Sequence, residues 1–370
     1  MQIVKAGREA LLKPLQVVSG IVERRQTLPI LANILVRKDG ERVSFTATDL
    51  EIQIQTHAEL GSGKDSTATT VSARKLVDIL RALPEADVAL SLAGKKLTVQ
   101  SGKSRFNLQT LAAEEFPTVA QAEFSTDFAV PAASLKYLLS MVHFAMAAQD
   151  IRYYLNGMLL VLDGTVVRAV ATDGHRLALC EVTRDGADAG AAGKVEVIIP
   201  RKTILELMRL LPDSDDAVRV QMAANQVKFS FGPIELISKL VEGKFPDYTK
   251  VIPAGNTKVF TVAREAIMAA LARTAILTTD RFKGVRWVLA PSALKVSSTN
   301  ADQEEAQEEL EIDYSGDGLD IGFNVSYLLD VLGNLKSEQV KFALGDALGS
   351  ALISMPDSDR FKYVVMPMRI

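Results

Sequence analysis

One short pattern recurs three times along this chain of 370 residues. Each copy alternates apolar with polar residues, reaches a Thr followed by Asp or Asn, and most clearly in the second copy resumes its alternation. Such a pattern is typical of two β-strands joined by a tight turn. The copies begin their turns at Thr48, Thr172 and Thr299, spacings of 124 and 127 residues. Three similar hairpins at near-equal spacing predict a triplicated domain.

The order of elements around these hairpins also repeats. Each third reads as two similar halves of one helix and about four strands, which predicts six half-units and an α+β fold. We place the domains at 1–125, 126–253 and 254–370; the alternative is three unrelated α+β domains. Pro14 lies inside the first helix and should kink it or delay its start. The expected helices are 7–22, 73–83, 132–146, 200–211, 263–275 and 324–336.

Bulk properties describe an ordinary globular protein. The chain exceeds the length at which a single core keeps growing, and its apolar content of 48% lies far from the disordered class. The single cysteine, Cys180, excludes a disulfide within the chain and fits a reducing compartment. The start lacks the apolar region of a signal peptide, and no run approaches the ~18 apolar residues of a membrane span. We therefore expect a cytoplasmic protein that binds no membrane.

Residue sets that would carry catalysis or bind a metal are missing from the sequence. The three histidines, His57, His143 and His175, form no H-E-x-x-H pair or ligand cluster. Asp173 and His175 share a turn. We interpret Asp173 as a turn former and His175 as a residue on the surface or at the rim of a pocket. The acidic run 302–309 lacks the glycine and alternating spacing of a calcium loop and reads as a solvated or ion-pairing face. We expect no enzyme, no metal and no cofactor.

Positive charge is concentrated in the expected helices. They sum to +7 and the rest of the chain to −10, although the total is only −3. Arg74-Lys75 and Arg201-Lys202 lie in first turns, where the helix dipole opposes cations. Local stability does not explain them, whereas a shared anionic partner does. The alternative is chance, together with our choice of helix boundaries.

A size argument bears on how such helices could surround a duplex. Helices with side chains are about 10–12 Å across, so six in a closed ring leave an opening near 10 Å. Twelve leave about 25–30 Å, against a duplex of about 20 Å with grooves roughly 8 Å deep. One chain could not encircle a duplex, but two could.

Several longer motifs resemble the bacterial DNA polymerase III β subunits, the sliding clamps. The resemblance runs from residues 11–15 to the last residues. It implies repeated DNA-clamp domains with helices on one face of curved antiparallel sheets, and a head-to-tail homodimeric ring. It also implies a non-catalytic partner of double-stranded DNA, DNA polymerase and clamp-loader subunits, the proteins being bound through short peptide motifs. The motifs are 153–158 (YYLNGM), 171–177 (ATDGHRL), 322–327 (GFNVSY) and 364–369 (VVMPMR).

The resemblance implies DNA-contacting positions, and the basic helices add others. For the two tyrosines, packing in the core is the alternative. The expected set is Arg25, Arg74, Gln149, Arg152, Tyr153, Tyr154, Arg201 and Lys202.

The resemblance also implies a pocket for partner peptides. Two methionines and a proline near the end of the chain suit a plastic apolar groove that accepts many peptides; the alternative is a last strand buried in its own domain. This chain has Lys250 where the family often has Arg, Leu348 for a smaller aliphatic residue and Ile370 for Leu. The expected lining is Leu155, Thr172, Gly174, His175, Arg176, Leu177, Pro246, Val251, Phe282, Asn324, Tyr327, Leu348, Ser350, Val364, Val365, Met366, Pro367, Met368 and Arg369.

For the joint between subunits, the resemblance pairs a strand of one chain with a turn and an acidic strand of the other. Exposed ion pairs contribute only about 0–1 kcal/mol each, so apolar contacts should dominate, helped by pairing of strand edges. Gln307 stands where the family often has Glu. The expected residues are Lys75, Lys96, Lys103, Arg105, Phe106 and Leu108 facing Ile276, Leu277, Glu304, Glu305 and Glu308.

Two other hypotheses remain open at this stage. One is a scaffold that binds peptides and duplex DNA without encircling the duplex. The other is an enzyme built on the His175 turn. Retention on closed circular DNA separates the first from a clamp, and turnover that depends on His175 would identify the second.

Overall fold

Six α-helices and twenty-four β-strands make up the part of the chain that the computed structural model describes, residues 1–23, 28–61, 63–184, 193–279 and 282–369. One helix for every four strands is the ratio that the sequence predicts for six half-units. Three matching domains of α+β type are therefore confirmed. The helices are α1 (Arg8–Ser19), α2 (Ala73–Ala82), α3 (Ala132–Ser140), α4 (Arg201–Leu210), α5 (Arg264–Thr274) and α6 (Val325–Asn334).

All six helices are shorter than predicted, and the first and third differ most. The first begins at Arg8 and continues through Pro14, whose ring lies on the buried side, so the delayed start is wrong. The third ends at Ser140 rather than at residue 146, because at Val142 the amide bonds to the carbonyl three residues back instead of four. A short 3₁₀ helix, His143–Ala145, follows it.

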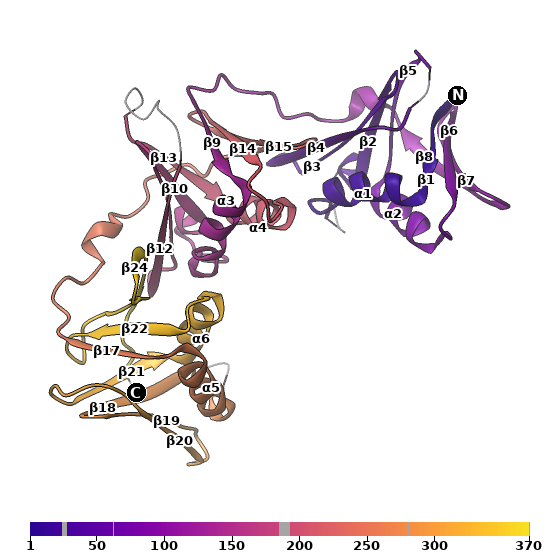
Figure 1. Cartoon of the computed structure of the whole chain (residues 1–370). Coiled ribbons are helices and arrows are strands. Elements are labelled where there is room, and N and C mark those ends of the chain that lie inside the picture. The colour runs from indigo at the N-terminus through magenta and orange to yellow at the C-terminus, as the bar shows by residue number, and fades with distance from the viewer. Residues whose placement is uncertain (24–27, 62, 185–192, 280–281, 370) are drawn as a thin grey trace. The chain divides into compact units, whose positions relative to one another are not determined.

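One continuous antiparallel sheet of twelve strands lies in the compact unit formed by residues 1–133 and 205–240 (Figure 1). Strand β4 pairs with β16, Ile54 opposite Leu236, so main-chain bonds join the first repeat to the second. In order across the sheet the strands are β1 (Gln2–Gly7), β6 (Asp87–Ala93), β7 (Lys96–Ser101), β8 (Ser104–Leu111), β5 (Ser66–Ser72), β2 (Asn33–Asp39), β3 (Arg42–Thr48), β4 (Ile52–Glu59), β16 (Ile234–Lys239), β15 (Gln226–Phe231), β14 (Ala217–Met222) and β9 (Thr126–Pro131).

The second compact unit, residues 134–204 and 241–370, holds two more antiparallel sheets. Strand β12 pairs with β24, Leu177 opposite Val364, which joins the second repeat to the third. The eight-stranded sheet has the order β13 (Val195–Pro200), β10 (Gly157–Asp163), β11 (Val166–Thr172), β12 (Arg176–Thr183), β24 (Ser358–Val365), β23 (Ala351–Met355), β22 (Gln339–Leu344) and β17 (Lys258–Ala263). The four-stranded sheet has the order β20 (Glu305–Glu311), β19 (Ala293–Thr299), β18 (Gly284–Ala290) and β21 (Leu319–Asn324).

The three predicted hairpins are confirmed, and they share one turn chemistry. In the first, the Asp49 carboxylate accepts hydrogen bonds from the amides of residues 51 and 52. In the second, Asp173 does the same for residues 175 and 176, and in the third Asn300 serves residues 302 and 304. Each loop contains one residue with positive φ, namely Leu50, Gly174 and Gln303. An Asx side chain bonding to nearby amides is what stabilises such turns.

In each unit two helices pack against each other and on the sheets, and an arginine at the start of one helix contacts the end of the other. Helix α1 packs against α2, and α5 against α6 (Figure 1). Arg8, the first residue of α1, donates to the Leu83 carbonyl at the end of α2, 2.7 Å away. Arg264, the first residue of α5, donates to the Leu332 carbonyl near the end of α6 at 3.2 Å and to the Ser337 carbonyl at 3.1 Å. A cation at a helix C-terminus is stabilised by the helix dipole, so these arginines hold neighbouring helices together.

We expect Arg264→Met to lower the free energy of unfolding by about 2 kcal/mol, because charged hydrogen bonds to two carbonyls are lost from a largely buried site. Arg74→Met is the matched control: Arg74 also lies in a first turn, but its side chain is 73% exposed and the change should stay within about 0.5 kcal/mol. Urea unfolding followed by circular dichroism measures both. Equal effects would contradict the structural role of Arg264.

Candidate partner-binding site

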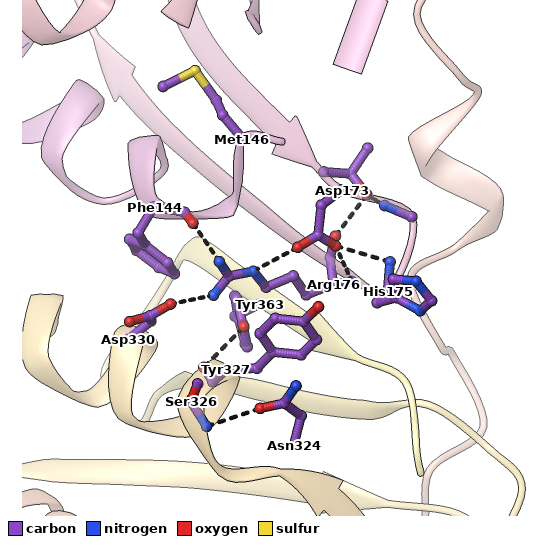
Figure 2. Close-up of polar contacts among 12 residues, drawn as sticks. Phe144, Met146, Asp173, His175, Arg176, Asn324, Ser326, Tyr327, Asp330 and Tyr363 are labelled. Carbon is purple, nitrogen blue, oxygen red and sulfur yellow. Dashed lines mark hydrogen bonds and ion pairs between the residues drawn. The ribbon is translucent and has the colours of Figure 1, made fainter. Parts of the chain in front are cut away.

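Arg176 is the centre of a polar network beneath the predicted pocket (Figure 2). Its guanidinium donates to Asp173 at 3.0 Å, to Asp330 at 2.6 Å and to the Phe144 carbonyl at 2.7 Å. The same group lies 4.4 Å from the ring centroid of Tyr327. Burial opposes the charge of Arg176, but its interactions with Tyr363, Asp330 and Asp173 outweigh burial and raise the pKa of the guanidinium. Because its donors are engaged within the chain, Arg176 fixes the pocket rather than offering a free cation to a ligand.

The hairpin that carries Asp173 and His175 has no catalytic arrangement in the described residues. One Asp173 oxygen accepts the amides of residues 175 and 176, and the other accepts Arg176. The His175 side chain is exposed at the rim, with its ring beside Asp173 in Figure 2. The carboxylate is thus committed to the turn, as the sequence predicts for a turn former.

The last described residues, 366–369, form what we call the closing segment. The Met366 amide donates to the His175 carbonyl at 2.9 Å, and the Met368 amide donates to the Gly322 carbonyl of β21 at 2.8 Å. The segment therefore runs from the hairpin of the second repeat to a strand of the third. Ile370 lies outside the described residues.

The predicted pocket residues divide into a buried floor and an exposed rim. Leu177 and Val364 are buried in a cluster that includes Phe245 and Tyr248, and Leu155 and Val365 are buried as well. Strand β24 is thus buried as the alternative predicts, but it pairs with β12 of the second repeat as well as with β23 of its own. The rim exposes apolar side chains, with Leu348 78% exposed. The other exposed apolar members are Val251, Phe282 and Met366.

Several predicted pocket residues lie around the Arg176 network. The Thr172 hydroxyl donates to the Arg176 carbonyl at 2.6 Å, and Gly174 supplies the positive φ of the turn. Asn324 caps α6 by accepting the Ser326 amide, and the Tyr363 hydroxyl donates to the Tyr327 carbonyl (Figure 2). Ser350 and the closing segment line a neighbouring hollow. Pro246 is exposed on the surface.

The expected DNA-contacting residues have varied surroundings. Tyr153 is 58% exposed, whereas Tyr154 packs partly against the buried cluster below the pocket, so core packing applies to Tyr154 alone. The Arg152 side chain donates two hydrogen bonds to Asp150, at 3.0 and 2.8 Å, and its amide donates a third; together they hold the pKa of that carboxyl at about 2. Arg201 donates to the Met146 carbonyl at 3.2 Å. Arg74, Gln149 and Lys202 lie on the surface or partly exposed, and Arg25 lies outside the described residues.

Arg201 therefore requires a correction to the charge argument. We expected that local stability would not explain cations in first turns, but Arg201 binds the carbonyl of a residue that follows α3. Arg74, by contrast, is exposed, and its contact with Asp78 among the described residues is a long 3.6 Å. Part of the helical positive charge is thus structural, and part, such as Arg74, is exposed to solvent.

The residues expected at the subunit joint lie on two strand edges. In β8, residues 104–109 pair with β7 and have no other partner strand in the described chain, and Phe106 is partly exposed. Strand β20 likewise pairs only with β19 among the described strands. Ile276 is 76% exposed, Leu277 is partly exposed, and both lie in a 3₁₀ turn beside β19. Glu308 already pairs with Arg273 at 2.7 Å. Lys75, Lys96, Lys103, Arg105, Glu304 and Glu305 are exposed, and Leu108 is partly exposed.

Sequence reasoning missed Asp330 and Phe144. Asp330 lies 154 residues from Arg176 in the chain, and Phe144 contributes a main-chain carbonyl, which any residue type could supply. The only signal for Asp330 was a charge on the mostly apolar helix 325–334. Pairing across such a distance depends on how β12 and β24 join.

Groups that could hold a metal ion, or helices that could cross a membrane, are not found in the described residues. Burial raises the pKa of the Cys180 thiol to about 12, so this cysteine is held as an unreactive thiol. Burial also lowers the pKa of His143.

Three α+β domains whose antiparallel sheets continue from one repeat to the next define a DNA-clamp protein. Family models for the N-terminal, central and C-terminal domains of the DNA polymerase III β subunit match residues 2–120, 129–247 and 249–369. The chain belongs to this family, the β sliding clamps.

Known members are similar over their whole length. The β sliding clamp of Pseudomonas aeruginosa is 47% identical over 365 residues, 98% of each chain, and that of Escherichia coli K12 is 44% identical over 364 residues, again 98% of each. A crystal structure of the Pseudomonas aeruginosa DNA polymerase III subunit β bound to griselimycin has a TM-score of 0.95 at 46% identity, covering 100% of both chains.

We expect Arg176→Met to lower the free energy of unfolding by about 2 kcal/mol, because Asp173 and the Phe144 carbonyl lose a charged donor in a largely buried site. His175→Ala, at the neighbouring exposed position, should change stability by no more than about 0.5 kcal/mol. Denaturant midpoints of the two variants test this. A larger loss for His175→Ala than for Arg176→Met would contradict the network's role.

Proposed function

We propose that two copies of this chain close head to tail into a ring around duplex DNA. The ring tethers the replicative polymerase, clamp-loader subunits and other replication and repair factors through short peptide motifs. We place its domains at 1–125, 126–253 and 254–370, its action in the cytoplasm, and no catalysis in the chain itself. The observation that carries this proposal is the match of all three domains, in order, to the β-subunit family.

The DNA side of the proposal needs contacts that are numerous but weak. Phosphate attraction provides sequence-independent affinity that falls steeply with salt, and tight contacts would stop a clamp from sliding. Arg74 and Tyr153 are exposed enough to meet a duplex, and Ile151 between Arg152 and Asp150 is 97% exposed. Retention by encirclement allows each of these contacts to stay weak.

The joint is supported by the two free strand edges and their opposite charges. Strand β20 and the turn before it carry Glu304, Glu305 and Glu308, while β8 and its approach carry Lys103 and Arg105. An exposed edge is a template for pairing with another chain. Exposed ion pairs contribute little, so Phe106 and Ile276 should supply most of the stability.

The pocket is supported by its rigid floor and soft rim. Buried Leu177 and Val364 and the Arg176 network fix the floor, while Leu348 and Met366 leave flexible apolar surface exposed. Such a surface adapts to different short peptides. The relative bound to griselimycin is a member of the same family, so we expect griselimycin to compete with polymerase peptides here.

The decisive experiment is retention on DNA. Clamp is loaded by its own clamp loader onto nicked circular DNA, the DNA is then cut with a single-site nuclease, and protein that remains bound is measured by gel filtration. A ring stays on the circle in about 0.3 M salt and leaves the linear form within minutes, because open binding is weakened by salt. Equal retention on both forms would indicate a scaffold that does not encircle DNA, and would overturn the proposal.

For the joint, we expect Ile276→Ala combined with Leu277→Ala to yield monomers, because these residues supply exposed apolar surface at the β20 edge. Sedimentation at nanomolar concentration measures the change. Leu348→Ala combined with Met366→Ala is the control, since it also removes exposed apolar side chains but lies at the pocket rim. A joint variant that remains dimeric under these conditions would show that the interface lies elsewhere.

A further inference from the structure

A hollow of about 740 Å³ lies beside the pocket in the second compact unit. Its floor is the exposed face of β18, β19 and β21, where Arg286 lies opposite Ser297 and Gly322 in the strand register. One wall is the closing segment, and the other is the loop that carries Leu348. A volume in this range is typical of ligand sites.

The hollow shares a wall with the predicted pocket. Leu348, Ser350 and the four residues of the closing segment line it, and all of them are also expected to line the pocket. The closing segment is therefore common to the two, and it is held at one end by the His175 carbonyl and at the other by the Gly322 carbonyl. A peptide that continues from the pocket along the closing segment therefore meets the residues that line the hollow.

The hollow offers main-chain groups to an extended chain. The Gly322 carbonyl accepts the Met368 amide, and in an antiparallel strand the two main-chain groups of a residue point to the same side. The Gly322 amide and both main-chain groups of Asp320 therefore face the same edge, and they have no main-chain partner among the described residues. Residues an odd number of positions from Gly322 face the other way, toward β18. The Val325 amide, for example, donates to the Lys283 carbonyl just before β18. An extended peptide could pair with this edge.

Side chains in the hollow favour an occupant that is apolar at one end and polar at the other. Leu348 and Met366 are exposed at the closing segment. Further along the floor, Arg286 pairs with Asp320 through two contacts of 2.9 and 3.1 Å from its Nε, and Ser297 presents a hydroxyl. Glu305 lies at the far end, on the edge that we assign to the subunit joint. The end at the closing segment is thus the part that remains for a partner.

We propose that this hollow binds the residues that adjoin the pocket-binding motif of a partner peptide. The flank lies extended beside β21, with an apolar side chain against Leu348 and Met366 and a polar side chain at the Arg286–Asp320 pair. The inference rests on the proposed peptide-binding function and deepens it, because the flank would distinguish partners that share a similar motif.

The test compares peptide lengths on the full-length protein. The shortest fragment of the polymerase catalytic subunit that still binds is found by truncation, and the same fragment is then extended by six native residues at either end. We expect one extension to bind about tenfold more tightly than the short peptide, the effect of one or two added hydrogen bonds and an apolar contact. Ser297→Tyr should fill the hollow and remove this gain while leaving the short peptide's affinity unchanged.

Lys295→Tyr is the matched control, because Lys295 lies on the same strand and the same face but outside the hollow, so it should keep the gain. Asp320→Ala, which disturbs the polar end instead of filling the space, should reduce the gain in part. The unchanged short peptide verifies that each variant is folded. Equal affinity of long and short peptides for the unmodified protein, or equal effects of the two tyrosine variants, would overturn the inference. Failure of the short peptide to bind at all, or of griselimycin to displace it, would instead count against the proposed pocket.

Discussion

Main-chain hydrogen bonding at strand edges is the constraint on which this architecture depends. A sheet edge exposes unpaired amides and carbonyls that must be paired, covered or protected. The chain pairs β4 with β16 in one compact unit and β12 with β24 in the other, so each repeat continues the sheet of its neighbour. The edges of β8 and β20 are among those left without a partner strand in the described chain, and a second copy of the chain would supply a partner for each of these two. The same requirement that joins repeats within the chain thus favours a joint between chains.

Arginine accounts for much of the remaining organisation. Arg8 and Arg264 each begin a helix and bind carbonyls at the end of its packed neighbour, and Arg201 binds the Met146 carbonyl beyond the end of α3. These positions recur because the repeats place a helix start beside a helix end. The net charge of +7 on the helices overstates the positive charge that DNA could contact, because these three arginines are bound to carbonyls within the fold. A weaker remaining attraction suits a protein proposed to slide.

Local chemistry was predictable from the sequence, and long-range pairing was not. The turns at Asp49, Asp173 and Asn300 follow from short-range bonding of an Asx side chain to nearby amides, so a repeated motif was enough to locate them. The end of α3 at Ser140 was missed because the residues that follow are apolar and compatible with either helix type. The contact between Arg176 and Asp330 was missed because it depends on β12 meeting β24, which no local pattern encodes.

Pocket and hollow share the closing segment, which two main-chain bonds attach beyond β24 in the part of the chain that the structure describes. Below it, Arg176 is held by three partners and the floor is buried, so rigidity is concentrated where a common motif would dock. Above it, exposed Leu348 and Met366 have freedom to repack. A site with a fixed floor and an adaptable rim can bind many partners with moderate affinity. Discrimination among those partners must then come from contacts outside the shared motif, and the hollow beside β21 lies where such contacts can form.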